Sequence, residues 1–307
     1  MVDERHFEIE VTAPFRLDLT VEVLRRRAHN LVDRWDGHCY RRTLIFDARP
    51  IEVEVRQRVE EPIPILSITL RGPGVLREGD LEARARQVLD RMLGLSVDLS
   101  GFYDLAERDE RLSGLAAKFR GMRPTRYPTV FETVVNAVAC QQLSLSVGVH
   151  LLNRLAGRYG TGLSGADESS GFPAPAQLAV ADLAELRALG FSNAKARVLV
   201  DTARRETSGE LDLESLVTLD DDSASRLLLG LAGIGRWSAE YVLLRGLGRL
   251  AVLPGDDVGA RNNLQRRFHR DDIADYESVA ALASEWWPYG GLVYFHLLLD
   301  SLAQQVP

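Results

Sequence analysis

Two adjacent carboxylates, Asp256 and Asp257, follow a Pro-Gly pair and stand where a helix carrying Arg261 is expected to begin. The simplest role of an aspartate at such a place is to cap the helix, by accepting a hydrogen bond from a backbone N–H. In a reaction site, a carboxylate would stabilise positive charge that develops in the transition state. Both roles are open on this stretch alone, and the sequence separates the two aspartates only weakly.

A tight turn with two glycines precedes the aspartates. The stretch SASRLLLGLAGIGRWSAEYVLLRG predicts a helix, a turn at residues 231–235 and a second helix. Gly233 and Gly235 allow a positive φ and a close approach of another backbone. The free amides at the start of the second helix would form an anion site that fits a phosphate. A packed helical hairpin with a glycine cap is the alternative.

An aromatic pair follows the turn. Trp237 and Tyr241 are four residues apart on the predicted helix, so they share one face. A core stripe is the commoner explanation of such a pair. Flat rings could also form the walls of a pocket for a base turned out of a nucleic-acid stack, and they attract a positively charged base.

Composition narrows the chemistry. The chain has 307 residues and a formal charge of −7, and only Cys39 and Cys140 are cysteines, so we expect neither a disulfide framework nor a bound cofactor. Of 37 basic side chains, only Lys118 and Lys195 are lysines, and both lie outside the hairpin. An amine nucleophile therefore has no candidate there. No apolar stretch predicts a membrane span or a signal peptide, and we expect a cytoplasmic protein.

The elements that must position these residues fall into two parts. The segments FEIEVTAP, HCYRRTLIF, IEVEVRQRV and IPILSITLRG have the alternation of strands, whereas LTVEVLRRRAHNLV and DLEARARQVLDRML have helical spacing. From about Gly101 nearly everything predicts helices. Two apolar helices break near CQQLS, AQLAVADLAELRALGF and NAKARVLVDTARRETSG predict two more, and TGLSGADESSGFPAP is the clearest loop.

Hairpin, Pro-Gly loop and aspartate together resemble the helix-hairpin-helix DNA glycosylases, and within them the 3-methyladenine DNA glycosylase II group. FETVVNAVACQQLS is similar to the group's helix and DNA-inserting turn, and EWWPYGGLVYFHLLLD to its last helix. The resemblance implies an α+β N-terminal domain with an antiparallel sheet, residues 1–100. An all-α helix-hairpin-helix glycosylase domain, residues 101–307, would follow, with two helical lobes around a cleft.

The resemblance also implies a role for particular residues. Asp257 would be the catalytic carboxylate, and Asp256 the turn-former. The base pocket would comprise Trp237, Tyr241, Phe131 and Leu298, where Leu298 stands in place of a tryptophan found in some relatives. The DNA-inserting turn would be Gln141, Gln142 and Leu143, with Gln142 as the foremost plug; the alternative is that these glutamines cap a buried helix break. The phosphate-binding hairpin would comprise Gly233, Ile234, Gly235, Arg236 and Ser238, and the backbone carbonyls of Leu229, Leu231 and Ile234 would bind a monovalent cation.

Four further residues complete these expectations. Lys195, Arg236 and Arg261 are candidate phosphate contacts, although each could be a solvated charge, and His296 is expected in the core. The predicted function is a monofunctional glycosylase, acting as a monomer on duplex DNA with a damaged base. It would use water to release 3-methyladenine and 7-methylguanine. The alternatives are an oxidised-purine glycosylase, a non-catalytic helix-hairpin-helix DNA-binding protein, and a helical scaffold with a sheet domain.

Overall fold

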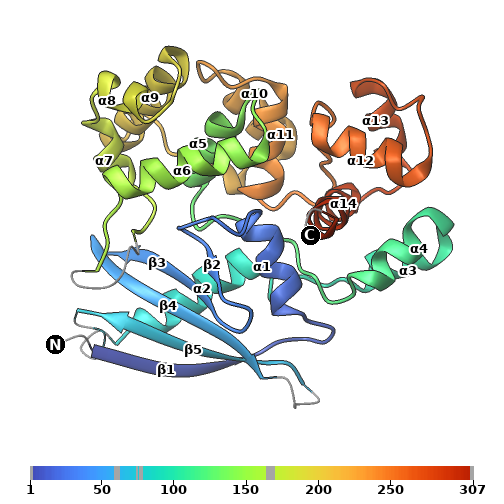
Figure 1. Ribbon diagram of the computed structural model, residues 1–307, viewed down its shortest axis with the longest axis horizontal. Coiled ribbons are helices and arrows are strands. Elements are labelled where there is room, and N and C mark those ends of the chain that lie inside the picture. The colour runs from blue at the N-terminus through green and yellow to red at the C-terminus, as the bar shows by residue number, and fades with distance from the viewer. Residues whose placement is uncertain (1–2, 59–62, 74, 76–78, 164–169, 305–307) are drawn as a thin grey trace.

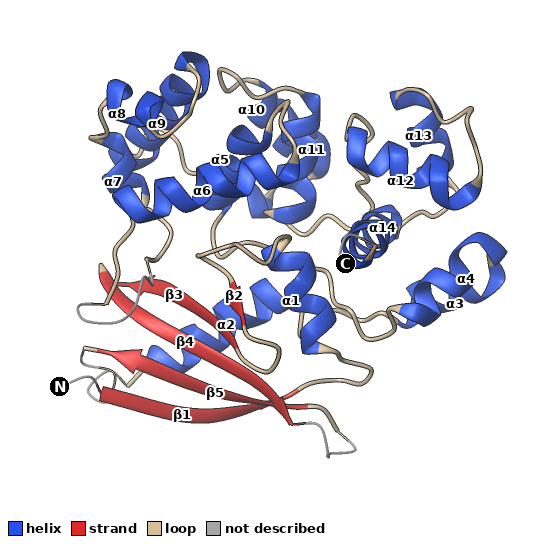
Figure 2. Ribbon diagram, in the orientation of Figure 1, coloured by secondary structure: helices blue, strands red, loops and turns tan. Residues whose placement is uncertain are grey.

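The N-terminal part is a five-stranded antiparallel sheet in a computed structural model that describes residues 3–58, 63–73, 75, 79–163 and 170–304. The strands lie in the order β1-β5-β4-β3-β2 (Figures 1 and 2). Their bounds are β1 (Asp3–Glu10), β2 (Arg34–Trp35), β3 (Tyr40–Phe46), β4 (Arg49–Arg58) and β5 (Ile65–Gly72). The alternating pattern predicts the four long strands, and only the two-residue β2 has no sequence signal of its own.

Two helices accompany the sheet, α1 (Leu17–Arg25) and α2 (Leu81–Leu93). The apolar spacing of LTVEVLRRRAHNLV predicts a helix through Val32, and this is wrong. The first helix ends at Arg25, because Arg26 adopts the left-handed conformation, with φ 62°, and its N–H bonds to the carbonyl of Glu22. Arg26 therefore lies outside α1, at its C-cap.

The remainder of the chain is helical (Figure 1). Its helices are α3 (Ser100–Arg108), α4 (Glu110–Lys118), α5 (Val130–Cys140), α6 (Leu145–Tyr159), α7 (Pro175–Ala179), α8 (Leu183–Ala188), α9 (Asn193–Ser208), the 3-10 helix η1 (Glu214–Thr218), α10 (Asp221–Leu229), α11 (Arg236–Arg245), α12 (Val258–Phe268), α13 (Tyr276–Ser284) and α14 (Gly290–Ala303). Among the described residues, no helix combines the length and apolar character needed to cross a membrane.

The structure has two helices where the sequence predicts one. The stretch AQLAVADLAELRALGF forms α7 and α8, because the Asp182 side chain accepts hydrogen bonds from the N–H groups of Ala184 and Glu185 and so starts a new helix. The loop expected at TGLSGADESSGFPAP lies partly outside the described residues, which omit 164–169. The helical breaks at residues 141–144 and 230–235 fall where the sequence predicts them.

A continuous apolar core joins the sheet to the helices. Buried side chains of β3, β4, β5 and α2 pack in one cluster with those of α5, α6, α9 and α11, and a second cluster lies between α3, α4 and α12–α14. A buried ion-pair cluster crosses the same junction. The Arg42 guanidinium of β3 donates to Asp33 and to Glu132 of α5, each at 2.6 Å. The helical part is therefore fixed against the sheet, and a domain boundary at residue 100 stays a prediction.

Candidate active site

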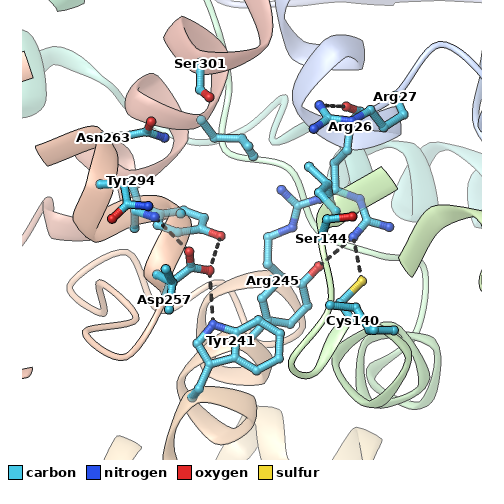
Figure 3. Close-up of a pocket in the computed structure, with 18 residues that line it drawn as sticks. Arg26, Arg27, Cys140, Ser144, Tyr241, Arg245, Asp257, Asn263, Tyr294 and Ser301 are labelled. Carbon is cyan, nitrogen blue, oxygen red and sulfur yellow. Dashed lines mark hydrogen bonds between the residues drawn. The ribbon is translucent and has the colours of Figure 1, made fainter. Parts of the chain in front are cut away.

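Asp257 is the N-cap of α12 and also faces a cavity. Its Oδ1 accepts a hydrogen bond from the backbone N–H of Ala260 at 2.8 Å. Its Oδ2 accepts from Trp237 Nε1 at 3.0 Å and from the Tyr294 hydroxyl at 3.2 Å (Figure 3). The two roles that the sequence left open are thus compatible, since one oxygen caps the helix and the other is held at the cavity by two donors.

The cavity has a volume of about 360 Å³. This lies within the range of small-molecule pockets, roughly 300–1,000 Å³. Trp237 and Tyr241 line it side by side, with ring centroids 5.4 Å apart, and Leu298 lines it from α14. Apolar and aromatic walls around one carboxylate suit a flat, electron-poor ligand. Three of the four side chains expected in the pocket are therefore brought together.

Phe131 is the fourth, and the structure places it elsewhere. It is buried in the core cluster and does not belong to the cavity lining. Phe131 is the second residue of α5, whereas the residue of this helix that lines the cavity is its last, Cys140. At 1.5 Å per residue, Phe131 lies roughly 13 Å down the helix from Cys140.

The cavity wall opposite Asp257 is basic. In Figure 3, Asp257 and Tyr294 lie on one side, whereas Arg26, Arg245 and Cys140 lie on the other. Arg26 is 4% exposed and donates to Asn136 Oδ1 at 2.7 Å, to the Tyr241 hydroxyl at 3.3 Å and to Cys140 Sγ at 3.7 Å.

Arg245 completes this basic wall. It is 1% exposed and donates to the carbonyl of Val23 and to the Tyr127 hydroxyl. Both guanidinium groups lie over the Tyr127 ring, at 5.6 Å for Arg26 and 5.0 Å for Arg245. Sequence patterns give no sign of this wall.

Tyr294 and Arg26 are functional candidates that the sequence analysis missed. Tyr294 had a usable signal, because it precedes Leu298 by one helical turn on α14 and so shares its face. Burial raises the pKa of Tyr294 well above its usual value, as does the neighbouring Asp257 carboxylate, so this hydroxyl is a donor at neutral pH. No sequence signal near Arg26 predicts its place in the cavity wall, since α1 ends there with a left-handed residue that the sequence does not predict.

The hairpin connects α10 to α11, and its two glycines differ. Gly233 has φ 78°, and a Cβ there would lie 2.4 Å from Val198 Cγ2 of α9, so glycine is required. Gly235 is the N-cap of α11 with an extended backbone, φ −96°, and no atom would lie within 4 Å of its Cβ. The expectation of a special conformation is thus wrong for Gly235. Its missing side chain instead leaves open space before the first amides of α11.

A second, more open hollow of about 820 Å³ adjoins the cavity. Gly233, Gly235 and Arg236 line it from the hairpin, and Gln141 and Gln142 line it from the turn between α5 and α6. Leu143, Trp237 and Asp257 line both spaces, so the hollow leads into the cavity. The hairpin, the expected inserting turn and the carboxylate therefore meet on one surface.

The three residues of the inserting turn have different surroundings. The Gln141 side chain donates to the carbonyl of Gly233 and to Ser238 Oγ, both at 2.9 Å, so it holds the hairpin in place. Gln142 is exposed with a left-handed φ of 54°, and Leu143 is 42% exposed. Gln142 and Leu143 are therefore the side chains that are free to project from this turn.

The three side chains expected to contact phosphates have different surroundings in the structure. Lys195 Nζ donates to the carbonyls of Ala139 and Gln141, at 3.1 and 2.7 Å, and so caps the end of α5. Arg236 pairs with Asp256 at 2.6 Å and lies 3.6 Å from the centroid of the Tyr276 ring. Asp256 is thus the partner of a hairpin arginine rather than a cavity carboxylate. Arg261 is half-buried on α12.

The carbonyls expected to bind a monovalent cation lie around the hairpin turn. Leu231 lies at the start of this turn, and its carbonyl accepts a hydrogen bond from the N–H of Ile234 at 3.1 Å. Neutral carbonyl oxygens suit a hard cation, so a cation held by Leu229, Leu231 and Ile234 stays a prediction. Within the part of the chain that the structure describes, no cluster of His, Cys, Asp and Glu could hold a metal ion.

His296 is a core residue, as expected. It is 1% exposed, its Nδ1 lies 2.8 Å from the carbonyl of Leu292, and burial lowers its pKa to about 4.

The chain was compared with known protein families and proteins. Residues 135–289 match the family described as HhH-GPD superfamily base excision DNA repair protein. The chain is 27% identical to "Putative DNA-3-methyladenine glycosylase YfjP" of Bacillus subtilis over 92% of this chain and 94% of that one. It is 30% identical to "DNA-3-methyladenine glycosylase 2" of Escherichia coli over 65% of this chain and 69% of that one.

Solved structures agree with the sequence relatives. A 3-methyladenine DNA glycosylase from Archaeoglobus fulgidus superposes with a TM-score of 0.84 at 26% identity, over 98% of this chain and 100% of that one. An 8-oxoguanine glycosylase/lyase of Clostridium acetobutylicum, in complex with DNA, superposes with a TM-score of 0.76 at 16% identity, over 100% of this chain and 99% of that one. The second likeness concerns the fold alone.

Proposed function

This chain belongs to the HhH-GPD superfamily of base excision DNA repair proteins, and we propose that it is a monofunctional glycosylase that excises alkylated purines from duplex DNA. Its relatives named DNA-3-methyladenine glycosylase support the class of substrate. The proposed bases are 3-methyladenine and 7-methylguanine.

One observation carries the proposal: the Asp257 carboxylate lies in the wall of an aromatic cavity that opens beside the hairpin. Breaking an N-glycosidic bond leaves positive charge on the sugar. A carboxylate at the mouth of a base pocket stabilises that charge where it develops. Trp237 and Tyr294 hold Oδ2 in a fixed position, so it needs no reorganisation as the charge appears.

The nucleophile in this proposal is water. Neither lysine lines the cavity, and Lys195 lines the adjoining hollow. Lys118 pairs with Asp300 at 2.7 Å, and Lys195 Nζ donates to two backbone carbonyls at the end of α5. Because both amines are engaged in these contacts, no Schiff base with the sugar is proposed, and Asp257 is the group that would orient water at the far side of the sugar.

The surrounding surface supports duplex binding and base flipping as parts of this proposal. The open side of Gly235 and the first amides of α11 would bind a phosphate beside the lesion. Gln142 and Leu143 project from the turn after α5, and one of them would fill the space that the flipped base leaves.

The proposal is tested by incubating the protein with methylated duplex DNA in EDTA and separating the released bases by chromatography. We expect 3-methyladenine and 7-methylguanine in solution, with intact sugar-phosphate strands until alkali is added. Borohydride should trap no protein–DNA adduct. Strong release of 8-oxoguanine with little release of methylated purines, or a trapped adduct, would overturn the proposal in favour of an oxidised-purine glycosylase. Binding to an abasic-analogue duplex without any base release would indicate a non-catalytic DNA-binding protein.

A further inference from the structure

Two buried guanidinium groups line the base cavity without an ion-pair partner among the described residues, and the carboxylates of Asp33 and Glu132 act on Arg26 only from a longer distance. Arg26 and Arg245 both line it, and neither has a carboxylate oxygen within the 4.0 Å of an ion pair among the described residues. Arginine remains protonated in proteins. Burying an unpaired charge is costly, so a guanidinium kept in this state usually awaits a ligand or stabilises a reacting group.

Arg26 is the guanidinium group whose partners face the cavity. It donates to Asn136 Oδ1 at 2.7 Å. Its contacts to Tyr241 and Cys140 are long, at 3.3 and 3.7 Å, and both of these residues line the cavity. Arg245 instead donates at 3.3–3.4 Å to two residues that do not line it. A guanidinium offers five N–H donors, so Arg26 retains hydrogen-bonding capacity for a ligand.

The cavity is therefore polarised. Asp257 supplies negative charge at the wall where the sugar would lie, and Arg26 supplies donors and positive charge at the opposite wall (Figure 3). A base seated between Trp237 and the Arg26 wall would present its edge remote from the sugar to the guanidinium.

We propose that Arg26 is the specificity-determining residue of this site and donates to the carbonyl oxygen at C6 of a flipped 6-oxopurine. The inference rests on the proposed function and deepens it. A 6-oxopurine such as 7-methylguanine has an acceptor at that position. A 6-aminopurine such as 3-methyladenine places N–H donors there, which oppose the N–H donors of the guanidinium.

The same contact favours bond cleavage. As the C1′–N bond breaks, its electron pair goes to the base, so cationic 7-methylguanine becomes neutral and the sugar takes the positive charge, which water then quenches with loss of a proton. Electron density rises at O6 during this step, and a hydrogen bond from Arg26 strengthens with it. Arg26 thus favours 6-oxopurines in the transition state as well as in binding.

The test measures single-turnover excision of 7-methylguanine and of 3-methyladenine from duplexes of one sequence, and follows the ratio of the two rate constants. Arg26→Met removes the guanidinium and keeps a side chain of similar length. We expect this variant to lower the ratio of 7-methylguanine to 3-methyladenine excision about tenfold, the effect of losing one hydrogen bond to a charged group. Arg26→Lys, which keeps the charge without the planar fork, should lower the ratio in the same direction.

Arg25→Gln is the matched control, because Arg25 is the neighbouring arginine, pairs with Glu22 and does not line the cavity. Its ratio should equal that of the unmodified protein. If Arg26→Met and Arg26→Lys release both bases at an unchanged ratio, or if the control changes the ratio equally, the role of Arg26 is overturned. Failure of the unmodified protein to release either base would instead contradict the proposed function itself. Thermal unfolding of each variant shows whether it is folded, and the ratio is independent of the folded fraction.

Discussion

At the scale of residues, the two oxygens of Asp257 have separate tasks. Oδ1 caps α12 and Oδ2 lies in the cavity. We predict that Asp257→Asn lowers excision on the order of 10²–10³-fold, because the negative charge is needed only in the transition state. Asparagine still caps α12 through Oδ1, but its Nδ2 cannot accept from Trp237 Nε1, so the free energy of unfolding should fall by about 1–3 kcal/mol. Binding to an abasic-analogue duplex should change little. Single-turnover kinetics, urea denaturation and gel shifts measure these effects.

Asp256→Asn is the control for this prediction. It removes the ion pair with Arg236 and leaves the cavity intact. Excision should remain within a few-fold of the unmodified protein. Retained turnover in Asp257→Asn together with its loss in Asp256→Asn would move the catalytic assignment by one residue.

His296 predicts a pH dependence of stability. Burial lowers the pKa of His296 to about 4 in the folded protein, whereas an exposed histidine titrates near 6.5. As the pH falls, the unfolded chain therefore binds a proton at this histidine at a higher pH than the folded protein does. The stability is fully present above pH 6.5 and is lost as the pH falls toward 4, by about 3 kcal/mol. Urea unfolding at pH 7, 5.5 and 4.5 should show this loss in the unmodified protein and a smaller one in His296→Gln. Equal losses would refute the assignment.

At the scale of elements, the two glycines of the hairpin between α10 and α11 have different roles. Gly233 is needed for the fold, whereas Gly235 leaves space in which a phosphate is proposed to bind. Gly235→Leu meets open space, so the protein should keep its thermal stability. Its duplex affinity should fall several-fold, equally for damaged and undamaged DNA, because a phosphate contact carries no base information. Fluorescence anisotropy with both duplexes measures this. Unchanged affinity would mean that the hairpin is only a helix connection.

Gly233→Ala should act on folding instead. Its φ of 78° and the 2.4 Å approach to Val198 predict a loss of about 1–3 kcal/mol in the free energy of unfolding. Urea denaturation checks this. A fully stable Gly233→Ala variant would show that α9 moves away at no cost.

An element could be predicted from the sequence where neighbouring residues determine it, and could not where contacts with distant parts of the chain determine it. The hairpin, the helix break after Cys140 and the cap at Asp257 follow from glycine, polar and aspartate signals within a few residues. Their meeting in one site was expected only from the resemblance to a known family. The end of α1 at Arg25 is different, because Arg26 adopts a left-handed conformation that its residue type does not favour. Tertiary hydrogen bonds to Asn136 and Tyr241 accompany it, and no pattern near Arg26 contains them.

At the scale of the whole molecule, a buried charge cluster joins the sheet to the helices. Arg42 is 1% exposed and bonds to both Asp33 and Glu132. We predict that Glu132→Ala lowers the free energy of unfolding by about 3 kcal/mol, since it removes one of the two carboxylates that bind a buried guanidinium and leaves Asp33 as the other. Urea denaturation measures the loss.

The comparison variant is Glu185→Ala, which breaks an exposed pair with Arg158. It should barely change the unfolding midpoint, because solvent screens such a pair. If Glu132→Ala were as stable as Glu185→Ala, the buried cluster would not hold the two parts together.

The residues that line the cavity are far apart in the chain. Arg26 follows the first helix, whereas Tyr294 and Leu298 lie on the last one, α14. A chain that stops after α11 would have Arg26 and the hairpin residues but would lack Asp257, Tyr294 and Leu298. The cavity can therefore be complete only in a chain that has been synthesised and folded through α14.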